Sequence, residues 1–163
     1  MQSIKNQTNK HFLVFPLGIT EKAAIAIEEI IEVFQLSFRE VVPVEEVPTC
    51  VLGNYEWRQE KLWLVDLENL FGLTPMEYTT TKFMTIVIKN HNKFVGICVR
   101  KLLDLKQLNP RDIQSPNPNL FRSDLLPFLQ GYFLEQNQDA LTILNPQTIT
   151  QLPSFKIEQL SKV

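Results

Sequence analysis

The chain has few of the residues that most often carry out catalysis or bind metals. Among its 163 residues are only two histidines, two cysteines and five glycines. His11 and His91 lack a metal-ligand spacing, and we expect both to be solvated. The glycines are isolated, so the sequence contains no GxxxxGK[ST] phosphate loop and no GxGxxG fingerprint, and it has no GxSxG nucleophile motif either. These absences argue against an enzyme, a bound metal and a cofactor.

Two further absences bear on where the protein works. Cys50 and Cys98 form no CxxC pair and have no nearby histidine, which is typical of reduced, buried cysteines. No apolar run reaches the ~18 residues that a membrane-spanning helix needs. Residues 1–10 are polar, without the apolar segment of a signal peptide, and we read them as a disordered tail. We therefore expect a cytoplasmic protein with no direct membrane insertion.

The charge is nearly balanced overall but unevenly distributed. Lysine and arginine total 16 and aspartate and glutamate 18, so the net charge is −2, which does not supply the basic field of a general nucleic-acid binder. Residues 1–82 hold 7 basic and 12 acidic side chains, whereas residues 83–163 hold 9 and 6. This asymmetry fits ordinary solvated surface, and it also fits two faces that meet partners of opposite charge.

Short apolar segments recur at intervals of roughly ten residues, with polar turns between them. This spacing is typical of an all-β fold with a few short helices, built as a small barrel or sandwich. From Glu28 we expect a helical turn that runs into a strand, and Arg58–Lys61 reads as a four-residue hairpin loop. The other strands are expected at residues 11–18, 23–27, 52–57, 62–67, 83–88, 94–99, 128–134 and 140–144.

Two short helices are expected from their capping residues. Asp66 precedes an apolar i, i+3, i+4 pattern that ends at Gly72, so we read it as an N-cap rather than as a catalytic acid. Asn145 with Pro146 has the pattern of an N-cap followed by proline at the first helical position, and Pro153 limits that helix. Residues 74–82 and 109–119 are expected to be connections without regular structure.

Four segments and a final hairpin then fit a known pattern. They are Phe12–Gly18, Ala26–Val33, Gly53-Asn-Tyr-Glu-Trp-Arg58 with Leu62-Trp-Leu-Val-Asp-Leu67, Val95-Gly-Ile-Cys-Val99, and Phe128–Tyr132 with Leu141–Asn145. In this order and spacing they resemble the CheW family of chemotaxis coupling proteins, from residue 11 to about 152. The chain departs from the family pattern at Glu56, Gln59, Trp63 and Arg100, where the family has Asn, Gly, Pro and Asp. The loss of that glycine suggests a different turn at the hairpin tip.

The resemblance implies a fold and a function. The fold would be two intertwined, small five-stranded SH3-like β-barrels that share an apolar core. The CheW-like domain would span 11–152, with a second barrel at roughly 75–130, a C-terminal part that returns to the first barrel, and a helical tail at 153–163. The protein would be a non-catalytic scaffold between the cytoplasmic tip of a chemoreceptor of the methyl-accepting type and the regulatory domain of a CheA-type histidine kinase. Its pathway would be chemotaxis, phototaxis or pilus motility.

Four residues match family positions associated with contacts to receptor or kinase: Arg58, Gly53, Ile30 and Glu32. The residues themselves agree with a binding role for Arg58, because a guanidinium at a hairpin tip can engage carboxylates or the backbone carbonyls of a helix. An ordinary solvated turn arginine is the other interpretation. A different functional class also stays open, namely a stand-alone small β-barrel that binds a small molecule or another protein, unrelated to motility.

Overall fold

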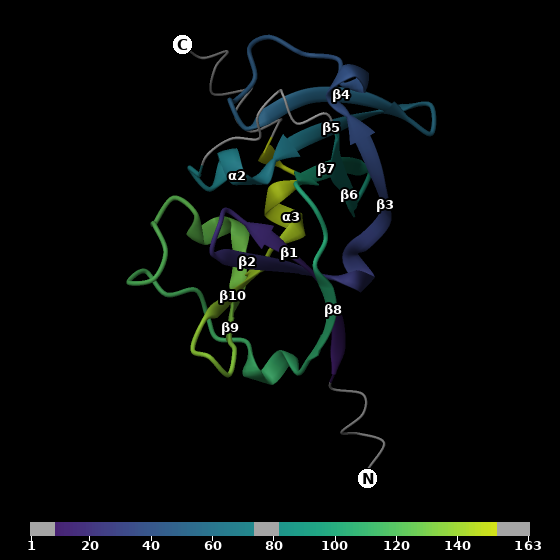
Figure 1. Cartoon of the computed structure of the whole chain (residues 1–163). Coiled ribbons are helices and arrows are strands. Elements are labelled where there is room, and N and C mark those ends of the chain that lie inside the picture. Colours follow the sequence, from purple (N-terminus) through teal and green to yellow (C-terminus); the bar gives the residue numbers. More distant parts are fainter. Residues whose placement is uncertain (1–8, 74–81, 153–163) are drawn as a thin grey trace.

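Two five-stranded sheets make up the fold of this computed structural model, which describes residues 9–73 and 82–152 (Figure 1). The first sheet has the order β8-β1-β2-β10-β9 and the second β3-β6-β7-β5-β4. Their strands are β1 Lys10–Leu17, β2 Glu21–Ala26, β3 Ile30–Ser37, β4 Val51–Trp57, β5 Glu60–Asp66, β6 Lys82–Asn90, β7 Lys93–Val99, β8 Asp104–Leu108, β9 Leu129–Leu134 and β10 Ala140–Leu144. The expected all-β class and pair of five-stranded units are confirmed.

Each sheet buries side chains on both of its faces, which explains why the strands read as nearly continuous apolar runs. In β1, Phe12 and Val14 pack in a cluster inside the first sheet, whereas Leu13 and Phe15 pack in a cluster shared with the second sheet. The alternation follows from the two-residue period of a strand. Members of the second sheet, such as Ile97, complete the shared cluster from the other side. The expected shared apolar core is therefore present.

The two sheets divide the chain differently from the expected boundary at 75–130. The second sheet takes all its strands from the middle of the chain, Ile30–Val99, and the first sheet takes its strands from either side of that segment. The chain crosses to the second sheet at β3, whose partner is β6, and returns to the first at β8, whose partner is β1. The C-terminal hairpin β9–β10 joins the first sheet through β2, in line with the expected return.

Side-chain contacts also join the edge strands of each sheet. Across the second sheet, the rings of Phe34 in β3 and Tyr55 in β4 lie 5.8 Å apart. Across the first sheet, Lys106 of β8 pairs with Glu135, which directly follows β9. The edge strands that carry no ladder hydrogen bonds are thus bridged by side chains, which protects them from pairing with other chains.

The short helices begin where the sequence indicated. A 3₁₀ turn, η1 (Ile27–Glu29), runs directly into β3. The Asp66 carboxylate accepts hydrogen bonds from the backbone of Glu68 and Asn69 at the start of α2 (Leu67–Leu70). The side chain of Asn145 accepts from the backbone of Gln147 at the start of α3 (Pro146–Ile149). Further 3₁₀ turns are η2 (Phe38–Glu40), η3 (Pro110–Asp112) and η4 (Leu126–Phe128).

One local expectation was wrong. The β4–β5 loop has two residues rather than four, because Trp57 and Glu60 still pair across the hairpin. Lys10, expected in the N-terminal tail, already belongs to β1, where it pairs with Leu108. The rest of that tail up to residue 8, the connection at 74–81 and the tail at 153–163 lie outside the described residues.

Candidate functional site

Three side chains from two strands and a hairpin turn meet at one end of the second sheet. Glu32 lies in β3, Trp57 is the last residue of β4, and Arg58 begins the β4–β5 turn. One carboxylate oxygen of Glu32 accepts two hydrogen bonds of 2.9 Å, from the indole Nε1 of Trp57 and from Nη2 of Arg58. The Arg58 guanidinium carbon also lies 4.5 Å from the centre of the Trp57 ring. We call these residues the Glu32–Trp57–Arg58 cluster.

The conformation of the turn determines where Arg58 lies. Both turn residues have a left-handed backbone, with φ of 49° at Arg58 and 66° at Gln59. Positive φ at both central positions is typical of the tight two-residue turns that match the twist of a hairpin. The family's glycine would fit this geometry at Gln59, since glycine adopts positive φ without the steric cost that other residues meet. The turn thus remains tight although the glycine is absent.

The cluster is accessible and held in place. The side chain of Arg58 is 59% exposed and that of Glu32 38% exposed, while Trp57 is buried at 6%. The indole and the carboxylate hold the guanidinium on two sides, which reduces the entropy that Arg58 would lose on binding. The donors not used by Glu32 can engage carboxylates or backbone carbonyls of a partner. This arrangement suits recognition of another protein.

The other two predicted site residues occupy different environments. Ile30 is half-buried, pairs with Ile88 of β6 and packs against the shared core. Gly53 is buried at a bulge in β4, with φ of 145°, and a Cβ there would lie only 2.1 Å from the carbonyl oxygen of Val42. The structure therefore brings Glu32 and Arg58 together, places Ile30 two residues away on the same strand, and gives Gly53 a role in backbone packing.

Sequence reasoning missed Trp57 as a member of the site and treated it as a packing residue. It does pack, since its ring lies 5.0 Å from that of Phe94 in the core of the second sheet. Its indole nitrogen additionally positions Glu32. The available signal was its place directly before Arg58, since a neighbouring aromatic ring often carries an arginine by cation–π contact.

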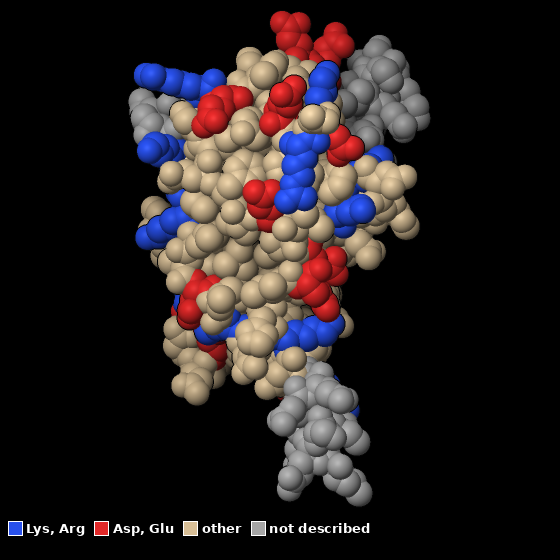
Figure 2. Space-filling model, turned by 90° about the vertical axis from the view of Figure 1, so that its right-hand side faces the viewer, with Lys and Arg blue, Asp and Glu red and all other residues tan. Residues whose placement is uncertain are grey.

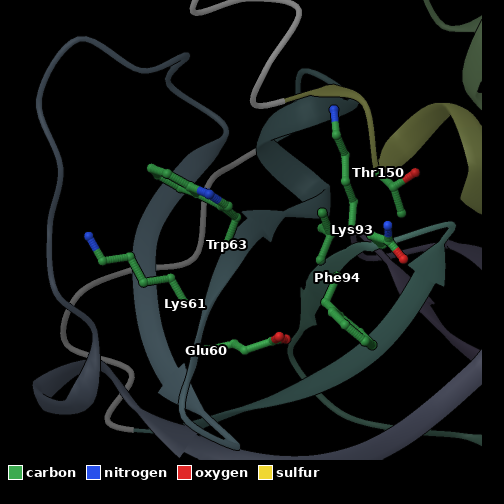
Figure 3. Close-up of a pocket in the computed structure, with 8 residues that line it drawn as sticks. Glu60, Lys61, Trp63, Lys93, Phe94 and Thr150 are labelled. Carbon is green, nitrogen blue, oxygen red and sulfur yellow. The ribbon is translucent and has the colours of Figure 1, made fainter.

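A depression beside this cluster could be considered as a small-molecule site. It has a volume of about 280 Å³ and lies where β5 and β7 begin. Figure 3 shows Trp63 and Lys61 on one side and Lys93 and Thr150 on the other, with Glu60 below. Charged and polar side chains form most of its wall, whereas pockets for small molecules are mostly apolar. The depression therefore gives no support to the small-molecule alternative.

Other groups of chemical interest are buried or dispersed. Cys50 and Cys98 are free and buried, as expected. Burial, with a smaller contribution from the nearby Asp66 carboxylate, raises the pKa of the Cys98 thiol far above its ordinary value, so this thiol is unreactive. Over residues 9–73 and 82–152, no three His, Cys, Asp or Glu side chains gather to hold a metal ion, and no helix is long and apolar enough to cross a membrane.

Charged side chains of both signs lie interspersed on the face that carries β3 and β8 at the right of Figure 1. Figure 2 looks onto this face and shows lysine and arginine beside aspartate and glutamate, with broad uncharged areas between them. The charge asymmetry along the sequence therefore does not appear on this face as separate acidic and basic regions. A partner docking here would meet uncharged surface with individual charges around it.

Comparisons with known proteins agree with this architecture. A sequence model of the CheW-like domain matches residues 11–153. Among solved structures, the scaffolding protein TtCheW from Thermoanaerobacter tengcongensis superposes with a TM-score of 0.69 at 18% identity, covering 83% of this chain and 88% of that one. Comparison with curated protein sequences gives no match. Because the domain model covers most of the sequence, the chain belongs to the CheW-like family.

Proposed function

We propose that this protein is a non-catalytic cytoplasmic adaptor that couples sensory receptors to a CheA-type histidine kinase. The observation that carries the proposal is the CheW-like domain match over residues 11–153. The two-sheet fold supports it, because that fold is shared with a protein described as a scaffold. The pathway would be chemotaxis, phototaxis or pilus motility.

For the kinase regulatory domain, we assign the Glu32–Trp57–Arg58 cluster. Arg58 is half exposed, is fixed by Glu32 and Trp57, and retains donors that point to solvent. Such pre-organised arginines are frequent at the energetic centres of interfaces. Ile30 would contribute through its strand, and Gly53 by keeping β4 close to the backbone of Val42.

A second surface is needed if receptor and kinase are to bind at the same time. Leu105 in β8 pairs with Leu13 of β1, so both side chains lie on the same face of the first sheet. Leu13 is buried in the shared core, whereas Leu105 is 58% exposed and Leu103, two residues earlier, is 44% exposed. Ile27, in the turn after β2, is 36% exposed.

These three residues, Ile27, Leu103 and Leu105, form what we call the apolar face. The ion pair between Lys10 and Glu28 places η1 beside the start of β1, whose other neighbour is β8. Exposed aliphatic side chains beside a core are suited to the apolar side of an amphipathic helix. We therefore assign this face to the helical tip of the receptor.

The test is to titrate the protein with the purified kinase regulatory domain and with a receptor cytoplasmic fragment, separately and together. We expect each partner to bind alone and both to bind at once. Leu105→Lys should abolish receptor binding and leave kinase binding unchanged. Leu120→Lys is the matched control, since Leu120 is 56% exposed in the loop between η3 and η4. Failure of both partners to bind would contradict the adaptor function and favour an unrelated binding module.

A further inference from the structure

A buried ion pair lies where the two sheets meet. Arg100, directly after β7, donates from Nε to both carboxylate oxygens of Glu68 in α2, at 3.0 and 3.1 Å. The Glu68 side chain is only 3% exposed and that of Arg100 is 35% exposed. Sequence reasoning noted Arg100 only as a departure from the family pattern.

Glu68 also reaches the first sheet. Its second carboxylate oxygen accepts a long hydrogen bond of 3.4 Å from the backbone nitrogen of Gly18, in the turn between β1 and β2. Leu73, three residues after α2 ends, packs on the same turn, because a Cβ at Gly18 would lie 3.2 Å from its Cδ1 atom. The α2 region of the second sheet therefore supports the β1–β2 turn of the first.

Arg100 stands at the start of the connection that leads back to the first sheet. Leu102 packs against the shared core, and the backbone nitrogen of Leu103 donates to Val14 of β1 at 2.8 Å. Leu103 and Leu105 of the apolar face follow Arg100 by three and five residues. The position of Arg100 thus constrains the path on which these two leucines lie.

We propose that Arg100 is a positioning residue for the apolar face, acting through its ion pair with Glu68. Desolvation largely offsets the attraction within a buried ion pair, so apolar residues of similar size often give equal or greater stability. The pair differs from apolar packing in direction, because only one placement of the guanidinium satisfies the carboxylate. It fixes where the chain leaves β7 relative to the β1–β2 turn, and hence where Leu103 and Leu105 lie.

This inference rests on the proposed function only for the identity of the partner. The test therefore has one measurement without any partner, the methyl resonances of Leu103 and Leu105, and one with it, affinity for the receptor fragment. The variants are Glu68→Met combined with Arg100→Met, and Arg100→Lys, which keeps the charge. Lys101→Met is the matched control, since it removes an adjacent, exposed positive charge outside the pair.

We expect the double methionine variant to fold with an unchanged or higher midpoint of urea unfolding. Its Leu103 and Leu105 resonances should shift, and its affinity for the receptor fragment should fall roughly tenfold, within the range by which residues that touch no ligand alter coupling. Arg100→Lys should retain most of the affinity, and Lys101→Met should leave both measurements unchanged.

Two results would overturn the inference. A folded double variant with unshifted leucine resonances would show that the pair does not position the apolar face. Loss of folding would show that the pair serves stability instead. If the wild-type protein does not bind the receptor fragment, the proposed function fails, and the methyl resonances still decide the role of Arg100.

Discussion

The two arginine–glutamate pairs of the second sheet have nearly the same geometry and very different surroundings. The distance from Arg58 to Glu32 is 2.9 Å and from Arg100 to Glu68 it is 3.0 Å. Glu32 is 38% exposed, whereas Glu68 is 3% exposed. Water screens the first pair and leaves its arginine open to a partner, while the second is shielded and bonded to the fold on all sides. Burial, rather than distance, separates a contact available for binding from one that organises the structure.

The largest expected effect comes from removing one buried partner. Glu68→Ala leaves Arg100 without its carboxylate in a mostly buried site, and we expect a loss of about 3–5 kcal/mol in the free energy of unfolding. Glu32→Ala, the matched change in the exposed pair, should cost under about 1 kcal/mol, apart from any loss of order at Trp57. Urea unfolding of both variants measures the difference, and equal losses would remove the distinction between the pairs.

Reversing the charge of the exposed pair should affect binding more than folding. Arg58→Glu removes charge-assisted donors and places a second carboxylate beside Glu32, so we expect about 2 kcal/mol weaker kinase binding, roughly thirtyfold. Stability should fall by less than about 1 kcal/mol, through the lost surface pair and the Trp57 stacking. Titration with the regulatory domain and thermal melts check both numbers. Unchanged affinity would show that Arg58 is an ordinary turn residue.

The tight turn that carries Arg58 can be relaxed without touching the pair. Gln59 has a φ of 66°, a conformation that glycine adopts without steric cost, so Gln59→Gly should raise stability by about 0.5–1 kcal/mol. Gln136→Gly in the β9–β10 turn is a control, because no left-handed backbone is recorded there. A destabilised Gln59→Gly variant would mean that side-chain contacts of Gln59 outweigh the strain of the turn.

A third ion-pair cluster, in the first sheet, should show a pH dependence. Hydrogen bonding from Lys106, aided by the charges of Lys106 and Lys22, lowers the pKa of Glu135 below its ordinary 4.5. Because the folded-state pKa is lower than the unfolded one, this stabilisation is complete above about pH 4.5 and is lost as the pH falls through the folded pKa. Glu135→Gln should therefore flatten the acid side of the stability–pH profile, and an unaltered slope would exclude this contribution.

Local features of the fold could be predicted from the sequence because their signals lie within a few residues of each other. The alternation in Phe12–Leu17 indicated a strand, and the caps Asp66 and Asn145 marked two helix starts correctly. The allocation of strands to sheets depends instead on pairings such as β3 with β6, whose partners lie about fifty residues apart. No periodicity encodes such a pairing, which explains why the boundary between the two sheets was misplaced.

The candidate site was predictable in its members but not in its contacts. The family resemblance pointed to Glu32 and Arg58, yet their ion pair joins residues 26 positions apart and depends on how β3 meets β4. Glu68 and Arg100 are 32 positions apart, and neither belongs to a charged motif. Gly53 was placed among the contact residues, although its neighbour Val42 shows why only a glycine fits there. Spacing along the chain does not report these approaches in space.

The most direct test of the distinction between the two pairs is a pair of double-mutant cycles on the free energy of unfolding. One cycle replaces Glu68 and Arg100 by methionine, singly and together, and the other does the same for Glu32 and Arg58. We predict a coupling of about 2–3 kcal/mol for the buried pair and under about 1 kcal/mol for the exposed pair. Couplings of equal size would contradict the division between a pair that organises the fold and a pair left available for binding.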